Sequence, residues 1–153
     1  MAFQITSSAF SQGGAIPVAY TGDGPDQSPP LSWPAGPDGT KSFVLIVDDP
    51  DAPRGVWVHW VLYNIPSEVH SLAAGAGKSA PLPTGAKEGT SSFGATEYMG
   101  PSPPPGRPHR YFFKLYALDT TLDLPAGVAK EEVEEAMDGH ILAMSELMGR
   151  YGR

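Results

Sequence analysis

Cysteine is absent from this 153-residue chain, which excludes disulfide bonds, thiolate metal ligands and a cysteine nucleophile. No apolar run approaches the length of a membrane span, and the first ten residues lack the basic start and apolar run of a signal peptide. Basic residues are also scarce: 10 Lys and Arg stand against 17 Asp and Glu, and a net charge of -7 argues against nucleic acid as a partner. We therefore expect a cytoplasmic protein without an integral membrane segment.

Glycine and proline, by contrast, are abundant, with 18 and 17 residues spread over many short segments. Such spacing indicates many turns and favours a β-rich fold over a helical one. The length suits one domain, residues 1–153, with a core of its own.

Three segments have the pattern of core strands: residues 41–48, 57–64 and 110–118. The first is apolar at both odd and even positions, which predicts a central strand with both faces buried. Strict alternation in the second places His59 on the same face as Trp57. After residue 130 the apolar spacing becomes helical, and we expect helical pieces at 130–138 and 139–148. Strands followed by helices predict mostly antiparallel β structure with a helical tail.

The chain is organised around the stretch DDPDAPRGVWVHWVLYN, residues 48–64, in which three acids precede a strand that carries His59. Acids at the mouth of buried strands are costly unless they have partners. A second strand histidine, His109, follows the segment PSPPPGRP, which holds five prolines in eight positions and must form a rigid loop. Two imidazoles and the Tyr111 hydroxyl offer donors to the oxygens of a phosphate or carboxylate. Asp49 can fix an imidazole tautomer or accept from a zwitterion's ammonium group.

Other interpretations remain open at this point. Each histidine, the acid cluster and the proline loop, taken alone, is more often structural than functional. Asp49 and His59 with Ser102 as nucleophile would make a small-ester hydrolase, although a serine between prolines has few backbone N–H groups nearby for an oxyanion hole. His59, His109 and Asp49 could also count as three metal ligands.

The blocks DDPDAP, WVHW and GPSPPPGRPHRY, together with SPPLSW, EGTSSFG and the closing HILAMSELMGRYGR, resemble the phosphatidylethanolamine-binding protein family, in its bacterial and archaeal, Raf kinase inhibitor-like branch. The resemblance implies a mainly β fold, a two-sheet antiparallel Greek-key β-sandwich with peripheral C-terminal helices. It also implies a pocket for phosphate or phosphoethanolamine-type head groups, no metal, and a cis bond before Pro53. Carried over position by position, the ligand-binding residues are Asp49, Asp51, Trp57, His59, Ser102, Pro103, Pro104, His109 and Tyr111.

Two departures from the family pattern stand out. Position 102 is often Cys or Gly in relatives and is Ser here, and the C-terminal helix of animal members has no match in this chain. From the residues and the resemblance together we expect a binding protein without catalytic residues or a cofactor. Its expected partner is a small anionic or zwitterionic ligand. The resemblance also raises regulation of a kinase or serine protease, and we keep a homodimer as a hypothesis.

Overall fold

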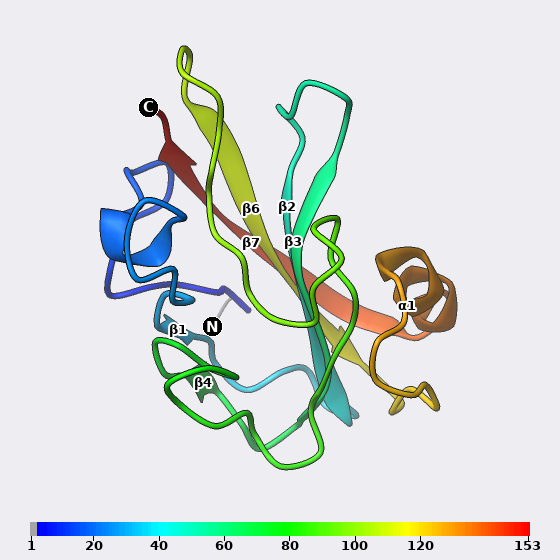
Figure 1. Cartoon of the computed structure of the whole chain (residues 1–153). Coiled ribbons are helices and arrows are strands. Elements are labelled where there is room, and N and C mark those ends of the chain that lie inside the picture. Colours follow the sequence, from blue (N-terminus) through cyan, green and yellow to red (C-terminus); the bar gives the residue numbers. More distant parts are fainter. Residues whose placement is uncertain (1–2) are drawn as a thin grey trace.

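The computed structural model describes residues 3–153 and is built on one five-stranded antiparallel sheet in the order β5-β3-β2-β6-β7 (Figure 1). A separate two-stranded antiparallel sheet pairs β1 with β4. The predicted mainly β fold with two antiparallel sheets is confirmed. The strands are β1 (Leu31–Ser32), β2 (Ser42–Asp49), β3 (Trp57–Pro66), β4 (Ser71–Leu72), β5 (Lys87–Glu88), β6 (His109–Leu118) and β7 (Ile141–Tyr151).

Strand β2 lies at the centre of the sheet, as its apolar pattern predicts, and all eight of its residues are buried. Its side chains alternate between two cores. Phe43, Leu45 and Val47 enter the larger core, whereas Val44 and Ile46 enter a smaller core on the opposite face. Burial on both faces explains why this segment has no polar side until Asp48.

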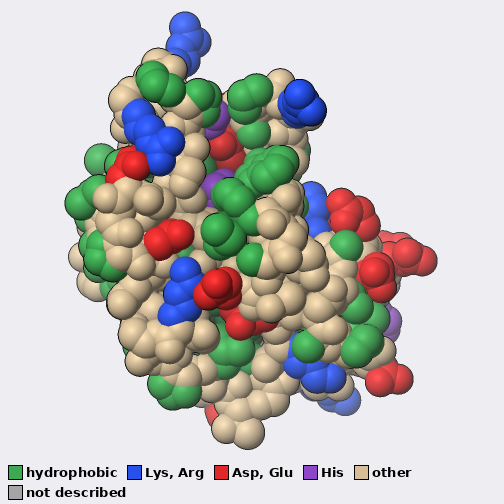
Figure 2. All heavy atoms as spheres, in the orientation of Figure 1, with side chains coloured by type: hydrophobic (Ala, Val, Ile, Leu, Met, Phe, Trp, Pro, Cys, Tyr) green, Lys and Arg blue, Asp and Glu red, His purple; other side chains and the backbone are tan. Residues whose placement is uncertain are grey.

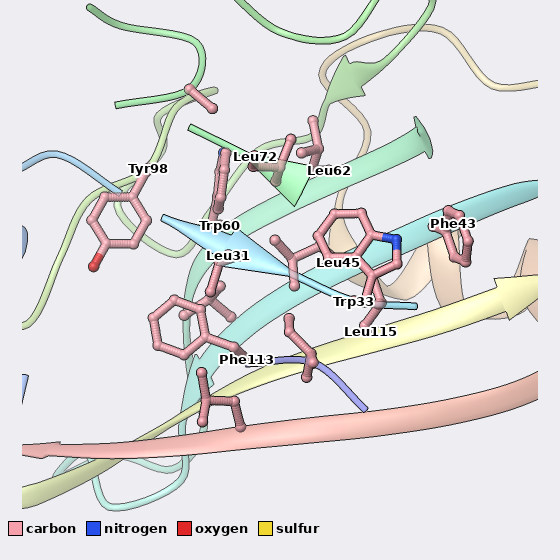
Figure 3. Close-up of a cluster of buried hydrophobic side chains, with 14 of the residues drawn as sticks. Leu31, Trp33, Phe43, Leu45, Trp60, Leu62, Leu72, Tyr98, Phe113 and Leu115 are labelled. Atoms are coloured by element: carbon pink, nitrogen blue, oxygen red, sulfur yellow. The ribbon is translucent and has the colours of Figure 1, made fainter. Parts of the chain in front are cut away.

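The larger core lies between the five-stranded sheet and the segments that carry β1 and β4 (Figure 3). Trp33 packs edge-on against Phe43 at 5.7 Å between ring centroids, and Trp60 packs edge-on against Tyr98 at 5.6 Å. These large rings close the gap between the two layers, so the short β1–β4 sheet holds its position mainly through side-chain packing.

Two helical segments are present among the described residues: the 3-10 turn η1 (Val18–Tyr20) and the helix α1 (Lys130–Met137). The helix α1 covers the smaller core with Val133 and Met137, while its glutamates face solvent, as the helical spacing predicts. None of the helices described has both the length and the apolar character that a membrane crossing requires.

The second predicted helical piece, residues 139–148, is wrong, because this segment forms most of the edge strand β7. Asp138 is the C-cap residue that ends α1. Burial in β7 follows a period of two, with Ser145, Leu147 and Gly149 buried. The apolar residues that suggested a helical face, Ile141, Leu142 and Met144, stay exposed. Pairing along the whole length of β6 decides the conformation here, since tertiary context overrides a weak local pattern.

Candidate ligand-binding pocket

One end of the five-stranded sheet opens into a cavity of about 330 Å³. Two loops flank it: the acid loop, residues 50–56 between β2 and β3, and the proline arm, residues 101–108 before β6. Figure 2 shows the resulting notch, with histidine and acidic atoms visible at its base and basic side chains on its rims. The cavity is lined by Asp49, Ala52, Pro53, Arg54, Trp57, His59, Phe93, Ser102, Pro103, Pro104, His109 and Tyr111.

A β-bulge in β3 turns His59 into this cavity. Val47 pairs with Trp60 and the next residue of β2, Asp48, pairs with Val58, so His59 is an extra residue in the ladder. A bulge re-aims side chains locally. Strict alternation would group His59 with Val61, which belongs to the smaller core, but the His59 ring instead meets Tyr111 edge-on at 5.2 Å. The predicted shared face of His59 and Trp57 agrees with the cavity that both residues line, whereas the bulge separates His59 from Val61.

His59 is held by the backbone of the segment that precedes the proline arm. Its Nδ1 lies 2.6 Å from the carbonyl oxygen of Met99, which can only accept, so Nδ1–H is the donor and Nε2 remains for other contacts. The ring is 3% exposed, and burial lowers its pKa, although the Met99 carbonyl partly opposes this shift. The neutral imidazole is thus favoured near pH 7, with Nε2 as an acceptor.

His109 has a different partner, the carboxylate of Asp49. Nδ1 of His109 lies 2.7 Å from Oδ2 of Asp49, and both residues are buried. The other carboxylate oxygen accepts the backbone N–H of Asp51 at 2.8 Å, which ties the acid loop to the same group. An ionised carboxylate only accepts, so Nδ1–H of His109 donates and its Nε2 is likewise left for a ligand.

Tyr111 supplies a donor that no group within residues 3–153 uses. Its side chain is 1% exposed and lines the cavity, yet its hydroxyl has no hydrogen-bond partner among residues 3–153. Burial, followed by the charge of Asp49, raises the pKa of this hydroxyl, so it remains protonated at ordinary pH. Buried polar groups without partners are rare and costly, so this hydroxyl needs an explanation beyond packing.

The proline arm forms one wall and is fastened at both ends. Arg153 donates to the carbonyl oxygen of Pro103 at 3.1 Å, and the N–H of Gly106 donates to the carbonyl of Arg153. Gly22 lies directly behind the arm and donates its N–H to Pro101. A Cβ at Gly22 would come within 2.1 Å of the Ser102 hydroxyl, so a larger residue there would force the Ser102 side chain to rotate. The fixed arm gives the cavity a stable edge.

The structure brings eight of the predicted site residues to the cavity and leaves one outside. Asp51 turns away and forms a bidentate pair with Arg110, at 2.9 and 2.8 Å. This pair holds the pKa of Asp51 at about 2. Sequence reasoning missed four lining residues: Ala52, Pro53, Arg54 and Phe93. Arg54 stands three residues after Asp51 in the stretch 48–64, and Phe93 belongs to the EGTSSFG block. Both residues therefore lie in segments that the sequence analysis singles out.

Three alternatives from the sequence can be compared with this geometry. Every peptide bond described is trans, so the predicted cis bond before Pro53 is wrong; the acid loop instead reverses at Gly55, whose φ is +112°. No group of three His, Cys, Asp or Glu side chains within residues 3–153 is placed to hold a metal ion. The hydrogen bonds expected of an Asp49–His59–Ser102 unit are not those observed, because Asp49 contacts His109 and His59 contacts Met99.

The family model of phosphatidylethanolamine-binding protein matches residues 6–152 of this chain. A UPF0098 protein of Methanothermobacter thermautotrophicus is 51% identical over 145 residues, with 95% of each chain covered. A UPF0098 protein of Aquifex aeolicus is 47% identical over 152 residues, covering 98% of this chain and 88% of the relative. The chain therefore belongs to the phosphatidylethanolamine-binding protein family.

Solved structures agree with this assignment. The crystal structure of CT736, a phosphatidylethanolamine-binding protein homologue from Chlamydia trachomatis, superposes with a TM-score of 0.91 at 46% identity, covering 99% of this chain and 98% of that one. The structure of YbcL from E. coli, described as a member of the mammalian family, gives a TM-score of 0.92 at 34% identity, covering 100% and 99%. The predicted membership of a family with bacterial and archaeal members is confirmed.

Proposed function

We propose that the cavity binds a small ligand through an anionic oxygen group, such as phosphate or the head group of a phosphomonoester like phosphoethanolamine, and does not transform it. The unused Tyr111 hydroxyl carries this proposal, since it is a buried donor in the cavity wall without a partner among residues 3–153. A ligand oxygen that accepts from it removes the cost of leaving this donor unpaired.

The two imidazoles define which ligands fit. With both Nδ1–H groups engaged, each neutral ring offers Nε2 as an acceptor, and each protonated ring offers it as a donor. A monoprotonated phosphate or an ammonium-bearing zwitterion supplies both hydrogens and acceptor oxygens, so it satisfies this mixed wall better than a fully deprotonated anion. Arg54 at the rim adds a positive charge, and Trp57 and Phe93 offer an apolar surface for the rest of a small ligand.

The absence of chemistry is part of the proposal and rests on Ser102. Its hydroxyl makes one long contact, 3.4 Å to the carbonyl oxygen of Gly100, and no basic side chain among residues 3–153 hydrogen-bonds to it. A serine without a base at hydrogen-bond distance is a weak nucleophile. Regulation of a kinase or serine protease remains a hypothesis that stems from the family resemblance.

Tyr111→Phe tests the proposal, because it removes only the unpartnered hydroxyl. We expect affinity for inorganic phosphate and phosphoethanolamine, measured by calorimetry, to fall about tenfold, the effect of losing a hydrogen bond to a charged group. The free energy of unfolding without ligand should stay equal or rise, because a buried orphan donor is gone. Tyr116→Phe is the matched control, a half-buried tyrosine five residues along the same strand but packed against the smaller core.

Unchanged phosphate affinity in Tyr111→Phe, or no phosphate binding by the wild type, contradicts the proposed pocket chemistry. A separate assay follows the release of alcohol from phosphate and carboxylate esters. We expect none above the buffer rate. Turnover that disappears in Ser102→Ala favours the hydrolase alternative instead.

A further inference from the structure

A second hollow, of about 520 Å³, lies on the other side of the wall formed by Pro104 and His109, which line both cavities. The remaining lining comes from the acid loop, the proline arm and the ends of two strands: Asp51, Pro105, Arg107, Pro108, Arg110 and Arg150. Strands β6 and β7 run side by side to this end of the sheet (Figure 1). The function proposed for the first cavity does not involve this hollow.

Its charge is strongly positive, with three guanidinium groups against one carboxylate. Both oxygens of that carboxylate, Asp51, are engaged by Arg110. Arg107 and Arg150 are exposed, and their side chains make no hydrogen bond or ion pair within residues 3–153. Two of the three cations in this hollow thus lack a counter-charge.

The strand register makes this arrangement more costly. Arg110 of β6 and Arg150 of β7 are paired directly opposite each other. Like charges directly opposite on neighbouring strands destabilise a sheet, and Asp51 compensates only one of the two. A bound anion between them is the simplest way to relieve the repulsion.

The distribution of basic residues over the whole chain points in the same direction. The chain has five arginines, and every one lies at this end of the molecule. Arg54 lines the first cavity, Arg107, Arg110 and Arg150 line the second hollow, and Arg153 bonds to the proline arm. No lysine within residues 3–153 lines either cavity, and three of the five pair with acids: Lys78 with Glu97, Lys114 with Asp48 and Lys130 with Glu134. Arginine matches the flat, two-oxygen geometry of carboxylate and phosphate, which lysine does not.

We propose that the second hollow is an oxyanion-binding subsite, built by Arg107, Arg110 and Arg150, for a phosphate or carboxylate group. The proline arm holds Arg107 on a stiff segment, so little conformational freedom is lost on binding. The group is either a free oxyanion or the second anionic group of a ligand whose first group occupies the neighbouring cavity. This subsite does not depend on the function proposed for that cavity.

The test is an NMR titration of the side-chain Nε–H signals of the five arginines with inorganic phosphate, at constant ionic strength maintained with sodium chloride. We expect the Arg107, Arg110 and Arg150 signals to shift together and to saturate. The double variant Arg107→Gln with Arg150→Gln should lower the affinity for phosphate, as given by these saturating shifts, about tenfold. The control double variant, Lys41→Gln with Lys130→Gln, lowers the net charge by the same amount but away from the hollow. It should change the affinity for phosphate less than about twofold. A linear drift equal to that in sodium chloride overturns the proposal.

Two further experiments show whether the anion is free or part of a longer ligand, and whether binding in the second hollow depends on the first cavity. A series of alkane bisphosphates is compared with propyl phosphate. If one ligand spans both sites, a bisphosphate of suitable length binds about tenfold tighter than the monophosphate, and the double arginine variant removes this advantage. Equal affinity with saturating arginine shifts identifies a free oxyanion. The arginine shifts should persist in Tyr111→Phe. Loss of phosphate binding in the first cavity can therefore be distinguished from loss of binding in the second hollow.

Discussion

The two ends of the central sheet are built from the same strands and differ in how completely they are closed. At the end where β2 begins, Phe43 stacks with Phe3 and meets Trp33 edge-on, and the Ser42 hydroxyl donates to the carbonyl of Thr120 at 2.6 Å. At the other end the strands surround a cavity. The two buried side-chain oxygens found without partners in residues 3–153, in Asp48 and Tyr111, both belong to this open end.

The difference separates a part of the molecule that serves stability from a part that, in the function proposed here, receives a ligand. At the closed end, apolar rings fill the space, and the Asn64 side chain donates to and accepts from the backbone of Leu122. At the open end, polar side-chain atoms of Asp48 and Tyr111 are buried without hydrogen-bond partners among residues 3–153. Their burial costs free energy of folding that packing elsewhere must offset. The following predictions test this contrast.

The largest effect is expected from Phe43→Ala at the closed end. Phe43 is fully buried and touches two aromatic rings, so its truncation should lower the free energy of unfolding by about 3–5 kcal/mol. At the open end, Trp57→Ala removes a larger side chain that is 37% exposed, and should cost only about 1 kcal/mol. Chemical denaturation measures both. Equal costs contradict the division between the two ends.

An intermediate effect should appear as a pH dependence that belongs to the open end. Burial lowers the pKa of His59 in the folded protein, so below about pH 6.5 the unfolded chain takes up a proton that the folded chain resists. Stability from this group is therefore complete above pH 6.5 and is lost as the pH falls, by at most about 1.4 kcal/mol per pH unit. Denaturation between pH 7 and 5 measures it.

Two variants isolate this pH effect. His59→Gln should flatten the loss, whereas His70→Gln, at an exposed position, should leave it intact. Phosphate should reduce the loss in the wild type, because a protonated His59 gains an anionic partner. A loss that is unchanged in His59→Gln locates the titrating group elsewhere.

The smallest effect is expected from Asp51→Asn, which breaks the bidentate pair with Arg110. The two side chains are 29% and 44% exposed, so solvent weakens the pair and the cost should be below about 1 kcal/mol. Since the pKa of Asp51 is lowered to about 2, the same contribution should disappear in the wild type as the pH falls from about 4 towards 2. A loss in the free energy of unfolding near that of Phe43→Ala would mean that the Asp51–Arg110 pair is essential for the stability of the open end.

Sequence patterns predicted the strands well where burial on both faces dictates them, as in β2, or where buried and less buried residues alternate, as in β6. They failed at β7, where HILAMSELM fits both a helical period and a strand period, and only the length of β6 beside it decides between them. At the pocket, the residue types and the family blocks predicted most of the lining. Arg54 and Phe93 were missed because each comes close to the other lining residues only through the path of its loop.

The sequence by itself determined the central strand, the stiff proline arm and the supply of imidazole, carboxylate and hydroxyl groups near one another. Those features follow from local composition and alternation, which act within a few residues. Only the tertiary structure decided that His109 pairs with Asp49, that His59 pairs with Met99, and that a bulge turns His59 into the cavity. These contacts join residues 60 and 40 positions apart, and no local pattern specifies which distant partner a ring nitrogen will meet.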